Sequence, residues 1–187
     1  MADKFKEIPN GEQTKILRAQ KKDLKNIAEI GKESFSGLKD PPSPKASARR
    51  GNKNAIKWIT CNFSAFPRMQ YFVAKKGKKI AGYVLWIEKG GFRKESVWEL
   101  EQIAVKKTFQ CQGIGGQLIE KSFLEIKNYL KKRKAFLKAV EVTTGAENQA
   151  QNLYKKILGA EPECVIKNLF RDDEIIMVAR FYNENRK

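Results

Sequence analysis

Histidine is absent from this 187-residue chain. The imidazole side chain is the commonest metal ligand and the commonest general base near neutral pH, so its absence removes both. Any proton transfer must therefore use a carboxylate, tyrosine, lysine, cysteine or water. We expect a protein without a metal cofactor.

Cysteine and long apolar runs are also scarce. Cys61, Cys111 and Cys164 are odd in number, far apart and without a CxxC pair, a pattern that does not build a disulfide framework. No apolar run reaches the roughly 18 residues of a membrane helix. The first residues lack the apolar core of a signal peptide. We expect a cytoplasmic protein with no membrane partner.

Acidic residues are outnumbered, with 21 Asp and Glu against 38 Lys and Arg, for a net charge of +17. Such a field attracts polyanions, among them nucleic acid, a ribosome or the phosphates of CoA. A lysine-rich surface that serves solubility alone is an equal alternative, because the lysines are spread along the chain. Nucleic acid is not the favoured partner, since no aromatic–basic platform for single strands is evident.

The length and composition suit one globular domain. We expect a loose polar tail over residues 1–13 and a single domain over residues 14–187. Three prolines within residues 41–44 predict an irregular, Pro-rich loop over residues 36–53. Monomer and homodimer both stay open.

Hydrophobic periodicity predicts a mixed α/β fold with helices on both faces of a sheet. Strands are expected near residues 16–19, 71–74, 79–87, 97–105, 135–143, 163–168 and 174–179. Helices are expected near residues 22–35, 54–63, 118–130 and 148–158.

The most informative segment begins with a strand that ends in Ile103-Ala104-Val105. After it come Gln110-Cys111-Gln112-Gly113-Ile114-Gly115-Gly116 and then a helical apolar pattern. Three glycines in four positions allow a tight turn and close approach to a ligand. The first turn of the helix presents unpaired N–H groups and a partial positive charge, which suit a phosphate. Leu118 replaces the third glycine of a dinucleotide fingerprint, and no Gly-Lys-Ser/Thr closes a P-loop.

The segment Gln110–Gly115 resembles the (Arg/Gln)-x-x-Gly-x-(Gly/Ala) acetyl-CoA loop of the GNAT (N-acetyltransferase) superfamily. Downstream, the segment from Asn148 through Ala150 to Leu153-Tyr154 resembles the family's second segment. The order of the predicted elements is similar as well, so the resemblance spans residues 15–180. It implies a single GNAT-like domain with a mostly antiparallel sheet of about seven strands and about four helices.

The resemblance also implies a cofactor and a reaction. Acetyl-CoA would place its pyrophosphate on the N–H groups of residues 110–116 and its pantetheine arm along Ile103, Ala104 and Val105. Asn148 and Tyr154 would lie beside the cofactor. The implied reaction is direct transfer of an acetyl group to a primary amine, which a protein N-terminus, a lysine, a ribosomal protein or a small molecule can supply.

Glu99 and Glu101 are the candidate bases for that reaction, directly or through water. Residues two apart on a strand share a face at about 6.5–7 Å. Two carboxylates beside a desolvated site raise the pKa of at least one of them toward neutrality. Glu99 is the first candidate, and a solvated surface pair is the alternative. Tyr154 is placed to protonate the departing thiolate, and a packed core aromatic is the alternative there.

Two functions without catalysis stay open. The chain can be a basic RNA- or ribosome-binding module, or a sensor of acetyl-CoA that keeps the fold. The binding module predicts nucleic-acid binding that depends strongly on salt. Both the binding module and the sensor predict that acetyl-CoA is not turned over.

Overall fold

The structure is a computed structural model of the whole chain, and it describes residues 13–35, 46–169 and 172–182. Residues 1–12 of the predicted tail and residues 36–45 of the predicted loop lie outside that description.

The described residues form seven strands in one sheet. In chain order they are β1 (Thr14–Arg18), β2 (Met69–Lys76), β3 (Lys79–Lys89), β4 (Glu95–Val105), β5 (Phe136–Gly145), β6 (Glu161–Ile166) and β7 (Glu174–Arg180). Across the sheet the order is β1-β2-β3-β4-β5-β7-β6, and only the β4–β5 pair is parallel. The predicted mixed fold with a mostly antiparallel sheet is confirmed.

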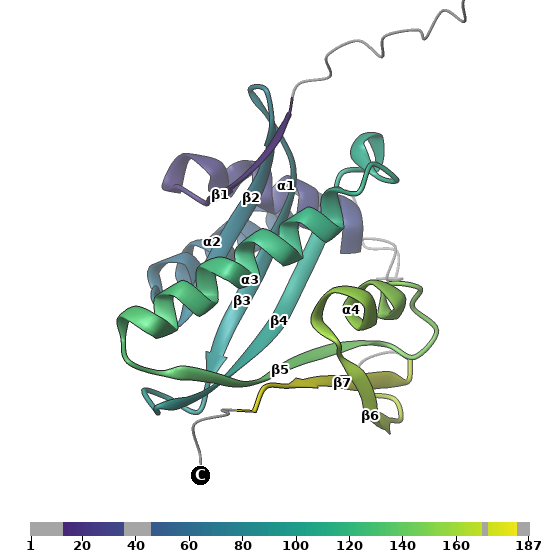
Figure 1. Cartoon of the computed structure of the whole chain (residues 1–187). Helices are drawn as coiled ribbons and strands as arrows, with labels where there is room; N and C mark the ends of the chain where they lie inside the picture. Colours follow the sequence, from purple (N-terminus) through teal and green to yellow (C-terminus); the bar gives the residue numbers. More distant parts are fainter. Residues whose placement is uncertain (1–12, 36–45, 170–171, 183–187) are drawn as a thin grey trace, which may run out of the picture.

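Four helices flank this sheet in the described part of the chain: α1 (Leu24–Phe35), α2 (Ala46–Ser64), α3 (Ile114–Lys132) and α4 (Gln151–Leu158). The helices α3 and α4 lie on one face, and α1 and α2 lie behind the sheet (Figure 1). None of the described helices is both long and apolar enough to cross a membrane.

The helix α2 begins at Ala46, so residues 46–53 are helical where the Pro-rich loop was predicted; that part of the prediction is wrong. The last proline is Pro44, and the alanines and arginines that follow are strong helix formers. Gly51 inside the helix costs about 1 kcal/mol relative to alanine. Further along the helix, Ile59 is buried in the apolar cluster that joins α2 to the sheet.

Two apolar clusters fill the two sides of the sheet. The front cluster joins the sheet to α3 and α4, and Trp86, Trp98 and Leu118 are fully buried in it. The back cluster joins β2, β3 and β4 to α1 and α2, with Ile27 and Tyr83 at its centre. Among the described residues, the back cluster contains none from β5, β6 or β7.

Helix α3 buries the stripe that its periodicity predicts. Ile114, Leu118, Ile119, Ser122, Ile126 and Leu130 are its buried residues. The one polar member is satisfied: the Ser122 hydroxyl accepts a hydrogen bond from the Trp86 indole at 2.8 Å and donates to the Leu118 carbonyl at 2.6 Å.

A buried ion pair ties the end of α3 to the sheet. Glu88 of β3 is only 4% exposed, and both of its carboxylate oxygens accept hydrogen bonds from the Arg133 guanidinium. The Ser96 hydroxyl of β4 donates to the same carboxylate at 2.6 Å. This network joins β3, β4 and the C-terminal end of α3 at one point.

We expect Arg133→Met to lower the free energy of unfolding by about 3 kcal/mol, because Glu88 would keep a buried charge without a partner. Urea denaturation followed by circular dichroism measures this change. The control is the double variant Arg133→Met/Glu88→Leu, which removes the stranded charge and should recover part of the loss. A single variant as stable as the unmodified chain would contradict the prediction.

Candidate functional site

The site begins where β4 and β5 part. Their parallel pairing starts at Glu95 and Phe136 and ends at Glu99 and Glu141. Beyond that point β4 continues to Val105 with β3 as its only strand partner, and β5 continues with β7. The two strands therefore leave an open edge between them in the middle of the sheet.

A β-bulge lies in β4 at this opening. Leu85 pairs with Gln102 and Trp86 pairs with Leu100, so Glu101 is the extra residue. Before the bulge the even-numbered residues face the front cluster, as Leu100 does. After it Ile103 and Val105 pack against the front cluster, and Ala104 lies in the back cluster. Bulges are common beside active sites because they redirect side chains.

The loop after β4 presents a row of free backbone donors. A short 3-10 turn (Lys107–Phe109) leads into residues 110–113, and α3 starts at Ile114. Within the described structure, no hydrogen bond uses the backbone N–H groups of residues 111–116, and no side chain caps the helix. Together with the helix dipole, these donors form a site for an anion.

Glycine is suited to its positions in this loop for different geometric reasons. Gly113 has φ +73°, a left-handed conformation that glycine adopts without a steric penalty. A side chain at Gly116 would lie 3.2 Å from Ile157 of α4, so the glycine allows close packing of the two helices. At Gly115 the first added carbon would lie 3.5 Å from Leu153, an ordinary contact. Both glycines therefore lie where the start of α3 packs closely against α4.

The polar side chains of the loop hold its shape. Gln110 donates to the Val105 carbonyl at 2.9 Å, and Gln112 accepts a hydrogen bond from Lys76 of β2 at 3.0 Å. Cys111 is exposed and has φ 58°, so its backbone also turns in the left-handed region. These contacts fix the loop while its N–H groups remain unpaired.

Asn148 lies just before α4, beside the end of β5. Helix α4 begins at Gln151 rather than at residue 148, because the Asn148 side chain accepts a hydrogen bond from the Ala150 N–H and builds a turn first. Its amide donates to the Thr144 hydroxyl at 2.8 Å. The side chain therefore shapes the loop at the mouth of the opening.

Tyr154 lies on α4 and is 5% exposed within the front cluster. Burial raises its pKa to about 12, so the phenol stays protonated at neutral pH. Its hydroxyl makes no hydrogen bond to any described residue. A buried, protonated and unengaged phenol can serve as a proton donor.

The two candidate glutamates differ in their partners. Glu99 lies at the last β4–β5 pair and forms an ion pair with Lys89 of β3 at 3.2 Å. Lys89 also binds Glu141 of β5 at 2.6 Å, and this hydrogen bond is the main reason that the pKa of Lys89 is raised. The charge of Glu99 is thus partly balanced by a neighbouring cation.

Glu101 lacks such an ion pair. Partial burial raises the pKa of its carboxyl, and the nearby charge of Glu99 raises it further, while Lys89 acts in the opposite direction. The structure thereby places Glu99 and Glu101 within electrostatic reach of each other at the opening. The pKa of the Glu101 carboxyl is thus shifted toward neutrality.

Two buried tyrosines lie behind Glu101. The Tyr83 hydroxyl donates to the Gln102 side chain at 3.0 Å. Tyr71 accepts a long hydrogen bond from Asn62 of α2 at 3.5 Å, and burial raises its pKa to about 12, with the charge of Glu101 contributing. Both phenols are therefore neutral and add hydrogen-bonding groups without charge.

Sequence reasoning missed Lys89, Glu141 and the two tyrosines. Lys89 faces Glu99 diagonally across the β3–β4 pair, because Lys89 pairs with Val97. That relation depends on the register between β3 and β4. The register is set by the loop over residues 90–94, whose geometry cannot be derived from the sequence. The tyrosines belong to strands that were predicted, but no motif marks them.

Metal binding finds no support in the described residues. They contain no group of three or more His, Cys, Asp or Glu side chains arranged to hold an ion. The expected absence of a metal stays a prediction.

A family model described as "Acetyltransferase (GNAT) family" matches residues 32–160. Similar solved structures include the ribosomal-protein-S18-alanine N-acetyltransferase from Escherichia coli, with 22% identity, a TM-score of 0.64 and coverage of 94% of this chain and 99% of that one. The histone acetyltransferase HPA2 and related acetyltransferase from Corynebacterium glutamicum has 18% identity, a TM-score of 0.71 and coverage of 92% and 98%.

A third similar structure is the NatC complex bound to Gag peptide and CoA, with 15% identity, a TM-score of 0.66 and coverage of 91% and 99%. A search of curated protein sequences found no match. The structural likenesses support the fold, and the family model covers more than half of the sequence. This chain belongs to the GNAT acetyltransferase family.

Proposed function

We propose that the protein transfers an acetyl group from acetyl-CoA to a primary amine. The observation that carries this proposal is the row of unpaired N–H groups over residues 111–116, next to the open edge of β4. The pyrophosphate of acetyl-CoA suits the unpaired N–H groups, and its extended pantetheine arm, which carries amide groups, suits the open edge of β4.

The residues beside the opening then have distinct roles. Ile103, Ala104 and Val105 supply the strand edge for the pantetheine arm, and Gln110–Gly116 hold the phosphates. Asn148 shapes the far wall of the opening through its bond to Thr144. Acetyl-CoA provides the activated thioester carbonyl.

We place the general base at Glu101, with Glu99 as a charge that tunes it. A base works best when its pKa lies near the working pH, and the pKa of Glu101 is shifted in that direction. Glu99 is held in its ion pair with Lys89. Proton removal by Glu101, directly or through water, leaves a neutral amine that attacks the thioester.

Tyr154 is the proposed proton donor to the departing thiolate. Its raised pKa keeps the proton available, and its hydroxyl has no partner among the described residues. The acceptor amine belongs to a protein N-terminus, a lysine or a small molecule, and the proposed setting is the cytoplasm.

We expect wild-type protein to acetylate peptide or small-molecule amines at a rate that depends on acetyl-CoA, as measured by mass spectrometry of the acceptor. Calorimetric titration should give one acetyl-CoA per chain at physiological and at higher salt. Binding that disappears with salt, without turnover, would instead support a polyanion-binding module.

Gly115→Trp should weaken acetyl-CoA binding by at least about tenfold, or ~1.4 kcal/mol, because the indole would occupy the space between α3 and α4. Isothermal calorimetry measures the dissociation constant. Gly115→Ala is the matched control, since its added carbon makes only an ordinary contact with Leu153. Undiminished affinity in a folded Gly115→Trp variant would exclude the loop as the phosphate site.

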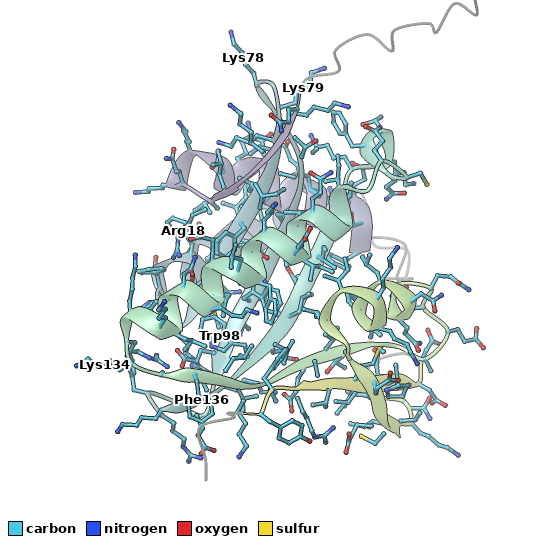
Figure 2. All side chains as sticks on the ribbon, in the orientation of Figure 1. Arg18, Lys78, Lys79, Trp98, Lys134 and Phe136 are labelled. Carbon is cyan, nitrogen blue, oxygen red and sulfur yellow. The ribbon has the colours of Figure 1, made fainter. Side chains whose placement is uncertain are left out.

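The pH profile of kcat/KM should fall on the acidic side as Glu101 becomes protonated. Lys89→Met removes the charge that lowers the pKa of Glu101, so the acidic limb should move to higher pH. Lys78→Met, in the distant β2–β3 turn, should leave the limb in place (Figure 2). Glu101→Gln should lower kcat/KM by about 10²–10⁴-fold. A limb that Lys89→Met does not move would assign the base elsewhere.

A further inference from the structure

A basic cavity opens beside the ion pair between Lys89 and Glu141. It has a volume of about 650 Å³ and lies at the end of the β3–β4 loop, over the first residues of β4 and β5. Val97 and Phe136 contribute apolar lining. Figure 2 places Phe136 at the end of the molecule opposite the β2–β3 turn with Lys78 and Lys79.

Cations dominate the lining of this cavity. Lys89, Arg93, Lys94 and Lys138 line it, against Glu95 and Glu141. The two glutamates are already paired, Glu95 with Lys138 at 3.1 Å and Glu141 with Lys89 at 2.6 Å. The exposed Arg93 and Lys94 side chains form no ion pair with the described residues. Two positive charges therefore remain available to a ligand.

A second cavity of about 370 Å³ continues the first, because both are lined by Glu95, Phe136 and Lys138. It extends to the end of β7, where Tyr182 is 85% exposed. The two cavities together form a trough, which is longer than a compact metabolite requires and has both apolar and cationic walls.

The trough lies next to the ion pairs that hold Glu99, the neighbour of the proposed base Glu101 on β4. Glu141 and Lys89 line it, and Lys89 forms the ion pair with Glu99. From Glu101 to Lys94 the chain runs seven residues, or about 23 Å when extended. An extended peptide with its amine at Glu101 would therefore reach Lys94 and Arg93 with side chains about six to seven residues further along.

We propose that this trough, named here the basic trough, binds an acidic segment of a peptide acceptor. The proposal rests on the proposed acetyl transfer for the position of the amine, and on charge complementarity for the ligand. Aspartate or glutamate side chains would pair with Arg93 and Lys94, where the guanidinium can bind a carboxylate with two hydrogen bonds. The basic trough would thus select acceptors by residues downstream of the amine.

The test uses two decapeptides that differ only at positions six to eight, with glutamates in one and lysines in the other. Each has a free N-terminus and a C-terminal fluorophore, and fluorescence anisotropy measures binding to the CoA-saturated full chain. We expect the acidic peptide to bind at least about fivefold more tightly than the basic one. Arg93→Glu/Lys94→Glu should abolish or reverse this ratio.

A matched control separates the trough from the overall charge of +17. Lys78→Glu/Lys79→Glu changes the net charge equally, at the far β2–β3 turn (Figure 2), and should leave the ratio unchanged. Arg93→Gln/Lys94→Gln should show a partial loss. Equal binding of both peptides, or equal loss in both charge-reversed variants, would overturn the proposal.

Mass spectrometry of the same peptides tests the proposed acetyl transfer separately from peptide binding in the basic trough. Acetylated amines without any charge preference in binding would leave the acetyl transfer intact and overturn the trough. Charge-selective binding that the trough variants remove, but without acetylation, would support the trough and exclude peptide amines as acceptors.

Discussion

Hydrogen bonding within the sheet stops between β4 and β5 after Glu99 and Glu141, and the rest of the site depends on this interruption. An unpaired strand edge inside a fold leaves polar backbone groups that need a partner. Here the edge lies next to the free N–H groups at the start of α3. Both features leave backbone donors or acceptors without partners among the described residues, and they suit the anionic and amide groups of the proposed cofactor.

The two carboxylates near the point where β4 and β5 separate, Glu99 and Glu101, are not equivalent. Lys89 of β3 forms ion pairs with Glu99 of β4 and Glu141 of β5. Glu101, the extra residue of the β4 bulge, lies two positions from Glu99 in the chain. Glu99 is paired with Lys89, whereas Glu101 forms no ion pair with a described residue. Strand register and one inserted residue therefore determine which of the two carboxylates has a cation as its partner.

Much of this arrangement was predictable from the sequence. The apolar spacing of α3 predicted its buried face, and the glycines after Gln110 predicted a tight turn with free donors. The β-bulge at Glu101 and the pairing of Lys89 were not predictable, because each depends on contacts between residues distant in the chain. Local patterns report backbone preference and periodicity, whereas strand register and ion pairing are properties of the folded sheet.

The positions of the two apolar clusters, on opposite faces of the sheet, determine which surfaces can change during evolution. The front cluster supports α3, α4 and the proposed donor site, while the surface near Arg93 and Lys94 contributes little to either core. Substitutions there can accumulate with small effects on folding. A lineage with this architecture could exchange one recipient molecule for another while the proposed donor site stays unchanged.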